Sequence, residues 1–395
     1  MIAHHKYTES LLYMGVLLAL LSSCAGPAVD RTPLPTGTVA QITALPSPSP
    51  SPTPAPDSPK PDSHEMAPWP TEEWSISTPE EQGMDPQTLQ AMFAAVRDGQ
   101  VGLNSILIVR NGAIVAESYY APFQQDDAQH LFSATKSVIA TLVGIAIEDG
   151  YIRSVDQPLL DFFSAEELAP LDEQKRRMTI AHFLTMTSGL EWYEMAPYEG
   201  DSLSQMIATP NWVAFVLSQP VAHVPGETFC YSSGGSHVLS ALLQQATGMS
   251  TQAYAQERLF EPLGIRDVAW RVDPQGVTLG GWGLSLTTRD MAKIGYLYLR
   301  EGQWEDTQVV PAEWVEASTT WHTTGTGPLE GWGYGYQWWL IPDLPYKVFE
   351  ARGRLGQHIM VVPERDLVVV FTSRTETGNV PIELLRDYIL PSVKF

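Results

Sequence analysis

Two apolar, β-branched runs near the start of the patterned part of the chain flank an Asn-Gly pair. The runs are residues 106–109 and 113–116, and Asn111-Gly112 lies between them. Both turn positions tolerate positive φ, so the pattern predicts a β-hairpin. The next apolar stretch, residues 133–148, has hydrophobic positions almost all round a helical wheel. A helix without a polar face is expected to be buried inside the protein.

The middle of the chain, residues 151–290, consists mostly of helical periods broken by Gly, Pro and Asp turns. Its clearest helical pieces are residues 213–217, 236–246 and 287–300. Hydrophobic positions recur there at the spacing that places them on one side of a helix. We expect this stretch to form a mostly helical subdomain.

Strand patterns return at the C-terminal end. Residues 357–362 and 367–371 are apolar runs separated by a turn-like Pro-Glu-Arg-Asp, and residues 382–390 form a last amphipathic helix. Strands first, helices in the middle and strands last predict an α+β fold. In it, one antiparallel sheet is built from both chain ends and flanked by helices, and the helical subdomain is inserted between them.

The first 24 residues have the pattern of an export signal. An apolar stretch at 11–21, too short to span a bilayer, ends in Leu-Ser-Ser-Cys24, which resembles the bacterial lipobox. We expect a lipoprotein signal peptide at 1–24, with Cys24 as the lipid anchor on the outer face of a bacterial membrane; the alternative is an ordinary signal peptide with an incidental Cys24. Residues 25–68 are rich in Pro and Ser and predict a disordered linker, so the folded domain is expected at 69–395.

The composition limits the classes of partner that the protein is expected to bind. The formal net charge is −22, from 45 acidic and 23 basic residues, and it disfavours nucleic acid or an anionic membrane surface. Membrane contact is therefore expected only through the N-terminal anchor. The second cysteine, Cys230, is interpreted as a small buried hydrophobe. The chain has no H-E-x-x-H, P-loop, G-x-G-x-x-G or G-x-S-x-G motif, so we expect no metal and no cofactor.

An S-x-x-K motif, Ser133 to Lys136, opens the apolar helix. Positions i and i+3 share a helix face, so the amine can lie beside the hydroxyl, and a buried amine with a lowered pKa can take the hydroxyl proton. The helix N-terminus favours a developing oxyanion. The plainer interpretation is a helix N-cap followed by a surface lysine.

A second candidate is Tyr231, in Cys-Tyr-Ser-Ser-Gly-Gly before another helical run. A tyrosine before a turn can present its phenol to a cleft and pass a proton between nucleophile and leaving group. The alternative is a core tyrosine.

Five stretches in this order resemble the serine β-lactamase and penicillin-binding-protein superfamily, specifically its class C-like esterase branch and the 6-aminohexanoate-dimer hydrolase-like enzymes. They are FSATKS at 132–137, LTMTSGL at 184–190, PGETFCYSS at 225–233, GWGLSLTTRD at 281–290 and GRLGQ at 353–357. The resemblance extends over most of 69–395.

The resemblance implies roles for individual residues. Ser133 would be the acylated nucleophile, Lys136 its base and Tyr231 the family's Tyr-x-Asn/Ser tyrosine, with Ser233 where β-lactamases have Asn. The oxyanion hole would be the backbone N–H groups of Ser133 and Arg354. The family's third motif, Lys-Thr-Gly or His-x-Gly, falls on a substrate-binding stretch made of Ala351, Arg352 and Gly353.

Ala351 departs from the pattern, because the cation that holds a β-lactam or peptide carboxylate is missing. Arg352 or Arg354 would be its replacement, although strand alternation points both to one face, which need not be the face of the site. Acids between 191 and 201 are interpreted as a solvated loop or, alternatively, as receivers of a cationic amine. Aromatic residues between 332 and 339 are interpreted as core or cleft wall.

The sequence therefore predicts a serine hydrolase that cleaves a small ester or amide, 6-aminohexanoate-dimer hydrolase-like, through an acyl ester on Ser133. Two alternatives remain. One is a β-lactamase or D-Ala-D-Ala carboxypeptidase, which the uncharged Ala351 disfavours. The other is a cell-envelope sensor domain that is acylated without turnover.

Overall fold

The computed structural model describes residues 68–394, except 100, 168–169, 195–199 and 327–328. The predicted signal peptide with Cys24, and the linker up to residue 67, lie outside the described residues. Within the described part, no helix is long and apolar enough to cross a membrane.

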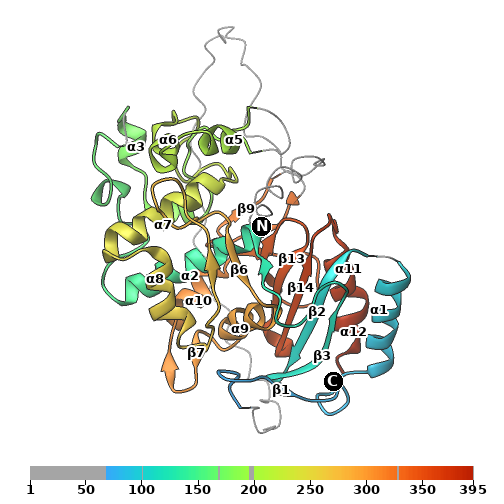
Figure 1. Ribbon diagram of the computed structural model, residues 1–395. Coiled ribbons are helices and arrows are strands. Elements are labelled where there is room, and N and C mark those ends of the chain that lie inside the picture. Colours follow the sequence, from blue (N-terminus) through green and yellow to red (C-terminus); the bar gives the residue numbers. More distant parts are fainter. Residues whose placement is uncertain (1–67, 100, 168–169, 195–199, 327–328, 395) are drawn as a thin grey trace, which may run out of the picture. The chain divides into compact units, whose positions relative to one another are not determined.

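A nine-stranded, mostly antiparallel sheet joins the two ends of this part of the chain, in the order β1-β3-β2-β14-β13-β12-β11-β10-β9. Strand β2 pairs antiparallel with β14, so early and late strands lie side by side, as the predicted topology required (Figure 1). The strands are β1 (Ser75–Ile76), β2 (Leu103–Arg110), β3 (Ala113–Tyr119), β9 (Thr323–Thr324), β10 (Gly333–Tyr334), β11 (Trp339–Leu340), β12 (Phe349–Gly353), β13 (Gln357–Val362) and β14 (Leu367–Ser373).

The predicted hairpin is β2–β3, and its turn has the expected geometry, with φ of 50° at Asn111 and 80° at Gly112. The two C-terminal strands are also confirmed as β13 and β14, joined by the short helical turn η5 (Pro363–Arg365).

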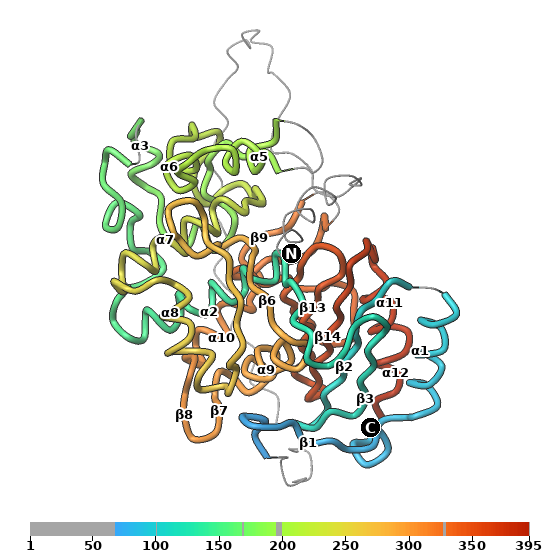
Figure 2. Tube along the Cα trace, viewed as in Figure 1, coloured from blue at the N-terminus to red at the C-terminus, as the bar shows by residue number. Residues whose placement is uncertain are grey.

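Helices cover both faces of the sheet (Figure 2). Alternate residues of β2 point to opposite faces: Leu107 belongs to the larger core and Ile108 to the smaller one. The smaller core lies under α1 (Pro86–Asp98), α11 (Val380–Leu384), the π-helical turn η6 (Leu385–Ile389) and α12 (Leu390–Ser392). Together, α11, η6 and α12 are the predicted last helix.

The larger core contains the predicted apolar helix. Its first turn is η1 (Phe132–Ala134), and α2 (Thr135–Glu148) follows. Every residue of α2 from Thr135 to Ala146 is buried, as expected of a helix with no polar face. Helix α9 (Thr288–Leu299) packs on β13 and β14.

The inserted part is mostly helical, as predicted, and the three clearest helical patterns correspond to α6, α7 and α9. The helices are η2 (Leu159–Asp161), α3 (Glu173–Arg176), α4 (Ile180–Leu184), α5 (Ser202–Ile207), α6 (Trp212–Ser218), α7 (Ser233–Thr247), α8 (Thr251–Ala255), η3 (Gln256–Phe260), α9 (Thr288–Leu299) and α10 (Ala312–Ser318). Two small sheets were not predicted: β4 (Gln129–His130), β5 (Ala269–Trp270) and β6 (Leu284–Leu286), and the pair β7 (Gln303–Trp304) and β8 (Thr307–Gln308).

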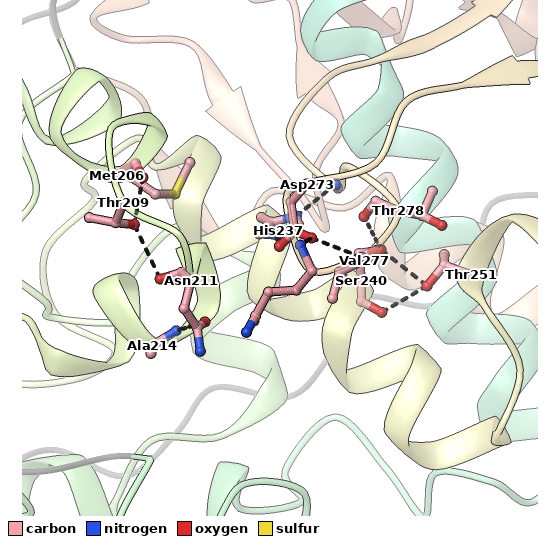
Figure 3. A network of polar contacts seen from close by, with 12 residues as sticks. Met206, Thr209, Asn211, Ala214, His237, Ser240, Thr251, Asp273, Val277 and Thr278 are labelled. Carbon is pink, nitrogen blue, oxygen red and sulfur yellow. Dashed lines mark hydrogen bonds and ion pairs between the residues drawn. The ribbon is translucent and has the colours of Figure 1, made fainter.

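A buried polar network ties α7 to the loop that leads into β6 (Figure 3). His237 Nε2 lies 3.1 Å from Asp273 Oδ2, and both side chains are fully buried. Asp273 Oδ1 accepts hydrogen bonds from the backbone N–H groups of Gln275 and Val277 at 2.8 and 2.9 Å. The network thus fixes the segment just before Gly281.

Candidate active site

Ser133 lies in η1, at the start of the buried helix, and hydrogen bonds hold the two residues before it. Leu131 N donates to Leu284 O at 2.9 Å, which continues the pairing of β4 with β6. Phe132 adopts a left-handed φ of 47°, and its N–H donates to His130 Nδ1 at 3.1 Å. A non-glycine residue in this region carries strain that the surrounding contacts must hold. The predicted nucleophile therefore follows a tightly constrained turn.

Lys136 lies one turn further along the helix and is 1% exposed. Its amine contacts three oxygens: Ser133 Oγ at 3.0 Å, Ser233 Oγ at 2.9 Å and Gly281 O at 2.8 Å. Burial lowers the pKa of Lys136 to about 8, although the charge of Glu194 opposes the shift. The interpretation of Lys136 as a surface lysine is wrong, and a substantial fraction of the amine is neutral near pH 8.

The contact with Gly281 depends on the absence of a side chain at that position. A Cβ on Gly281 would lie 2.7 Å from the carbonyl oxygen and 2.9 Å from the Cβ of Ser233. A larger residue would push this segment away from the start of α7. Glycine at position 281 therefore allows its own carbonyl oxygen to reach the Lys136 amine.

Tyr231 precedes α7, whose N-cap Ser232 accepts a hydrogen bond from Gly235 N at 2.9 Å. The Lys136 amine lies 4.8 Å from the centroid of the Tyr231 ring, and the Ser133 hydroxyl acts on the phenol by opposing the rise of its pKa. Burial, together with the charge of Glu194, holds the pKa of Tyr231 well above its usual range. The phenol therefore keeps its proton at neutral pH. The structure brings Ser133, Lys136, Tyr231 and Ser233 together.

Glu194 lies at the site, although the sequence pointed only to the acids of 191–201 as a group and gave it no contact with Ser233. Its Oε1 accepts a hydrogen bond from Ser233 Oγ at 2.6 Å, and its Oε2 accepts from Ser233 N at 2.7 Å and Trp192 Nε1 at 2.9 Å. The solvated-loop interpretation is therefore wrong for this residue. The available signal was a carboxylate two positions after a tryptophan, and Trp192 is buried.

The third-motif stretch lies on β12. Ala351 is buried in the larger core, on the side of the sheet that packs against α2. Arg352 donates to Glu350 at 3.2 Å, and its guanidinium lies 5.3 Å from the centroid of the Trp332 ring. Buried Glu350 is also paired with His358 Nδ1 at 2.8 Å. Arg352 is thus paired with a carboxylate, and its charge opposes the rise of the Tyr231 pKa.

The end of β12 packs directly on the segment before the predicted nucleophile. A Cβ on Gly353 would lie 2.0 Å from Leu131 O, so only glycine permits this approach. The elements that hold the two predicted oxyanion-hole residues, Ser133 and Arg354, are therefore neighbours. The Arg354 side chain is turned to Glu376, with Nε 3.3 Å from its carboxylate, and does not replace the missing cation.

An aromatic core cluster packs beside Tyr231, in line with the core side of the core-or-cleft-wall interpretation. Trp339 stacks on Tyr231 with centroids 6.2 Å apart, and Tyr334 and Phe229 pack behind Trp339. In the described part of the chain, no three His, Cys, Asp or Glu side chains are grouped as metal ligands.

Solved structures share this arrangement of sheet and helices. A penicillin-binding-protein homologue from Pyrococcus abyssi aligns with a TM-score of 0.60 at 20% identity, over 78% of this chain and 77% of its own. A family VIII carboxylesterase aligns with a TM-score of 0.63 at 16% identity, over 80% of this chain and 99% of its own. The fold is that of the β-lactamase-like class.

The amino-acid sequence also identifies the family. The model of the Beta-lactamase family matches residues 87–394, so the chain belongs to that family, within the serine β-lactamase and penicillin-binding-protein superfamily. The 6-aminohexanoate-dimer hydrolase of Paenarthrobacter ureafaciens is 25% identical over 286 residues, which cover 68% of this chain and 71% of that enzyme. The chain is therefore a β-lactamase-like hydrolase.

Proposed function

We propose that this hydrolase cleaves small esters or amides through a covalent acyl ester on Ser133. The observation that carries the proposal is the contact of 3.0 Å between Ser133 Oγ and a buried amine whose pKa is about 8. An amine that is partly neutral and beside a hydroxyl is placed to act as its base. The relationship to a 6-aminohexanoate-dimer hydrolase supports an amide or ester as the substrate.

In the proposed reaction, Ser133 Oγ attacks the substrate carbonyl and its proton passes to neutral Lys136. The bond to the leaving group then breaks, and the leaving group takes a proton from Tyr231, which regains one from Lys136. Water attacks the ester next, with its proton returned through the same groups, and this releases the acid and restores Ser133. The backbone N–H groups of Ser133 and Arg354 are the proposed oxyanion hole.

The charged groups around Ser133 favour a substrate without a carboxylate. Ala351 supplies no cation, Arg352 is paired with Glu350, and Glu194 adds a carboxylate. A substrate carboxylate beside these groups would lose hydration without gaining a partner. We therefore expect neutral esters and amides to be better substrates than β-lactams or D-Ala-D-Ala peptides.

The test compares the wild-type chain with Ser133→Ala. Both are mixed with a short-chain p-nitrophenyl ester and, separately, with a fluorophosphonate, and nitrophenol release and intact mass are followed. We expect sustained turnover and a single phosphonyl adduct, with loss of fluoride, in the wild type alone. A stoichiometric burst without turnover would favour the sensor function, and adduct formation on Ser133→Ala would refute this nucleophile.

We also propose that the domain is exported and lipid-anchored through Cys24, with residues 25–68 as the spacer. The Leu-Ser-Ser-Cys24 pattern supports this. Expressed in a bacterial host, the wild type is expected in the membrane fraction and Cys24→Ala outside it. Equal partition of the two proteins would contradict the anchor.

A further inference from the structure

The Ser233 hydroxyl lies between a carboxylate and an amine. It has one proton to donate, and a carboxylate only accepts. Because Ser233 Oγ is 2.6 Å from Glu194 Oε1, the hydroxyl proton lies in that hydrogen bond. Toward Lys136, 2.9 Å away on the other side, Ser233 Oγ can then only accept.

The other two oxygens that contact the Lys136 amine differ in whether they carry a proton to donate. Gly281 O, at 2.8 Å, is a carbonyl and only accepts, whereas Ser133 Oγ, at 3.0 Å, carries a proton. A neutral amine has two N–H bonds and one lone pair. With its N–H bonds directed to Ser233 and Gly281, the lone pair is left facing Ser133, which is the one contacting oxygen with a proton to give.

We propose that Glu194 is a positioning residue for acylation: it holds the Ser233 hydroxyl in its accepting orientation, so that the Lys136 lone pair is directed at Ser133. This inference rests on the proposed function, in which the Ser133 O–H bond breaks, its proton binds the lone pair, and Ser133 Oγ forms the bond to the carbonyl carbon. Without the Glu194 carboxylate, Ser233 can donate to the amine and compete with Ser133.

Glu194 is well placed for this role rather than for binding a substrate amine. Three donors, Ser233 Oγ, Ser233 N and Trp192 Nε1, already occupy its two oxygens, which together offer about four acceptor positions. The bonds from Ser233 N and Trp192 fix the carboxylate on buried neighbours. At most about one acceptor position is left for a substrate amine.

The charge of Glu194 acts on Lys136 as well. Burial lowers the pKa of Lys136, and Glu194 is the carboxylate that opposes this. The other ionisable groups at the site are Tyr231, whose ring faces the amine, and Arg352 of β12, which acts on Tyr231. Removal of the Glu194 charge is therefore expected to lower the pKa of Lys136 further.

The test is a double-mutant cycle on the full chain with Glu194→Gln, Ser233→Ala and the combination. The quantity measured is the rate constant of acylation by a p-nitrophenyl ester, at a pH where Lys136 is neutral. Glu194→Gln is expected to lower it by about 10-fold or more where Ser233 is present, because the proton acceptor is misdirected. In the Ser233→Ala background, which has no competing hydroxyl, the same substitution is expected to cost less than about 3-fold.

Glu191→Gln is the matched control, because Glu191 is exposed on the same loop. It is expected to acylate at the wild-type rate. If Glu194 merely anchored its loop, its substitution would cost the same with and without the Ser233 hydroxyl, and that additivity would overturn the proposal.

A second readout needs no turnover. NMR titration of isotope-labelled lysine side chains is expected to give a lower Lys136 pKa in Glu194→Gln than in the wild type, and an unchanged one in Glu191→Gln. A wild type that is never acylated would refute the proposed function, while this titration would still decide whether Glu194 is coupled to Lys136. An unshifted pKa would overturn that coupling.

Discussion

The charge state of one buried lysine controls the chemistry proposed for Ser133. The amine is surrounded by oxygen atoms, and burial stabilises its neutral form. Tyr231 is shifted the opposite way, because the same burial and the same carboxylate disfavour its phenolate. One environment thus shifts the two pKa values apart, which suits Lys136 to the proposed role of base and Tyr231 to that of a proton-carrying phenol.

This separation predicts a pH profile. For a neutral ester, kcat/KM is expected to rise with pH through the Lys136 pKa of about 8 and then level off, because the reaction needs the unprotonated amine. Tyr231→Phe is expected to lower the plateau by ~10²-fold, since a proton relay is lost, and to leave the midpoint of the rise in place. Steady-state kinetics from pH 6 to 10 measures both quantities. A midpoint that disappears with the phenol would instead assign the titration to Tyr231.

At the scale of elements, α9 determines how closely the helices approach the sheet. Gly295 faces the sheet, and a Cβ there would lie 2.6 Å from Val368 Cγ1 and 2.8 Å from Ile359 Cγ2. Gly295→Ala is therefore expected to destabilise the fold by ~1–3 kcal/mol through overpacking. Urea unfolding measures the change.

The control for that substitution is Gly235→Ala, in α7. There the nearest atom to an added Cβ is Ser232 Oγ at 3.4 Å, an ordinary contact. Its stability is expected to stay equal to the wild type or to rise by up to ~1 kcal/mol, because alanine favours the helix. Equal losses in the two variants would show that the sheet contact is not the cause.

Elements with a repeating local pattern were predictable from sequence. The hairpin at Asn111-Gly112, the apolar helix α2 and strands β13 and β14 all rest on turn chemistry or periodicity that a single segment contains. Strands β9, β10 and β11 have two residues each and form only because neighbouring strands pair with them. No period can be detected over so short a length.

Within the site, too, local spacing predicts one contact, whereas another arises only from packing. Ser133 and Lys136 are one helical turn apart, so spacing alone predicts their contact. Glu194 and Ser233 are distant in sequence and meet only through the packing of the 191–194 loop against the start of α7. Nothing local distinguishes Glu194 from the other acids of its loop, because the buried Trp192 is two positions before it and directly follows Glu191.

At the scale of the whole domain, the buried pair His237–Asp273 is expected to affect both the stability of the fold and the chemistry proposed for Ser133. The pair holds the loop that ends at Gly281, whose carbonyl contacts Lys136. Desolvation would raise the pKa of Asp273, yet hydrogen bonds from His237 and from backbone N–H groups keep it lowered. The carboxylate is therefore charged and needs its partner.

His237→Ala removes that partner and leaves the Asp273 charge buried, so it is expected to destabilise the fold by ~3 kcal/mol. It also frees the segment before Gly281, and we expect the acylation rate of the folded fraction to fall by ~10-fold as the lysine loses a fixed acceptor. The comparison is Gly295→Ala, which loses stability at a different contact of the same domain. Both variants are assayed at a temperature where circular dichroism shows them folded. If both acylate at the wild-type rate there, the pair serves stability alone. A loss of rate confined to His237→Ala would show that the pair supports the position of Lys136.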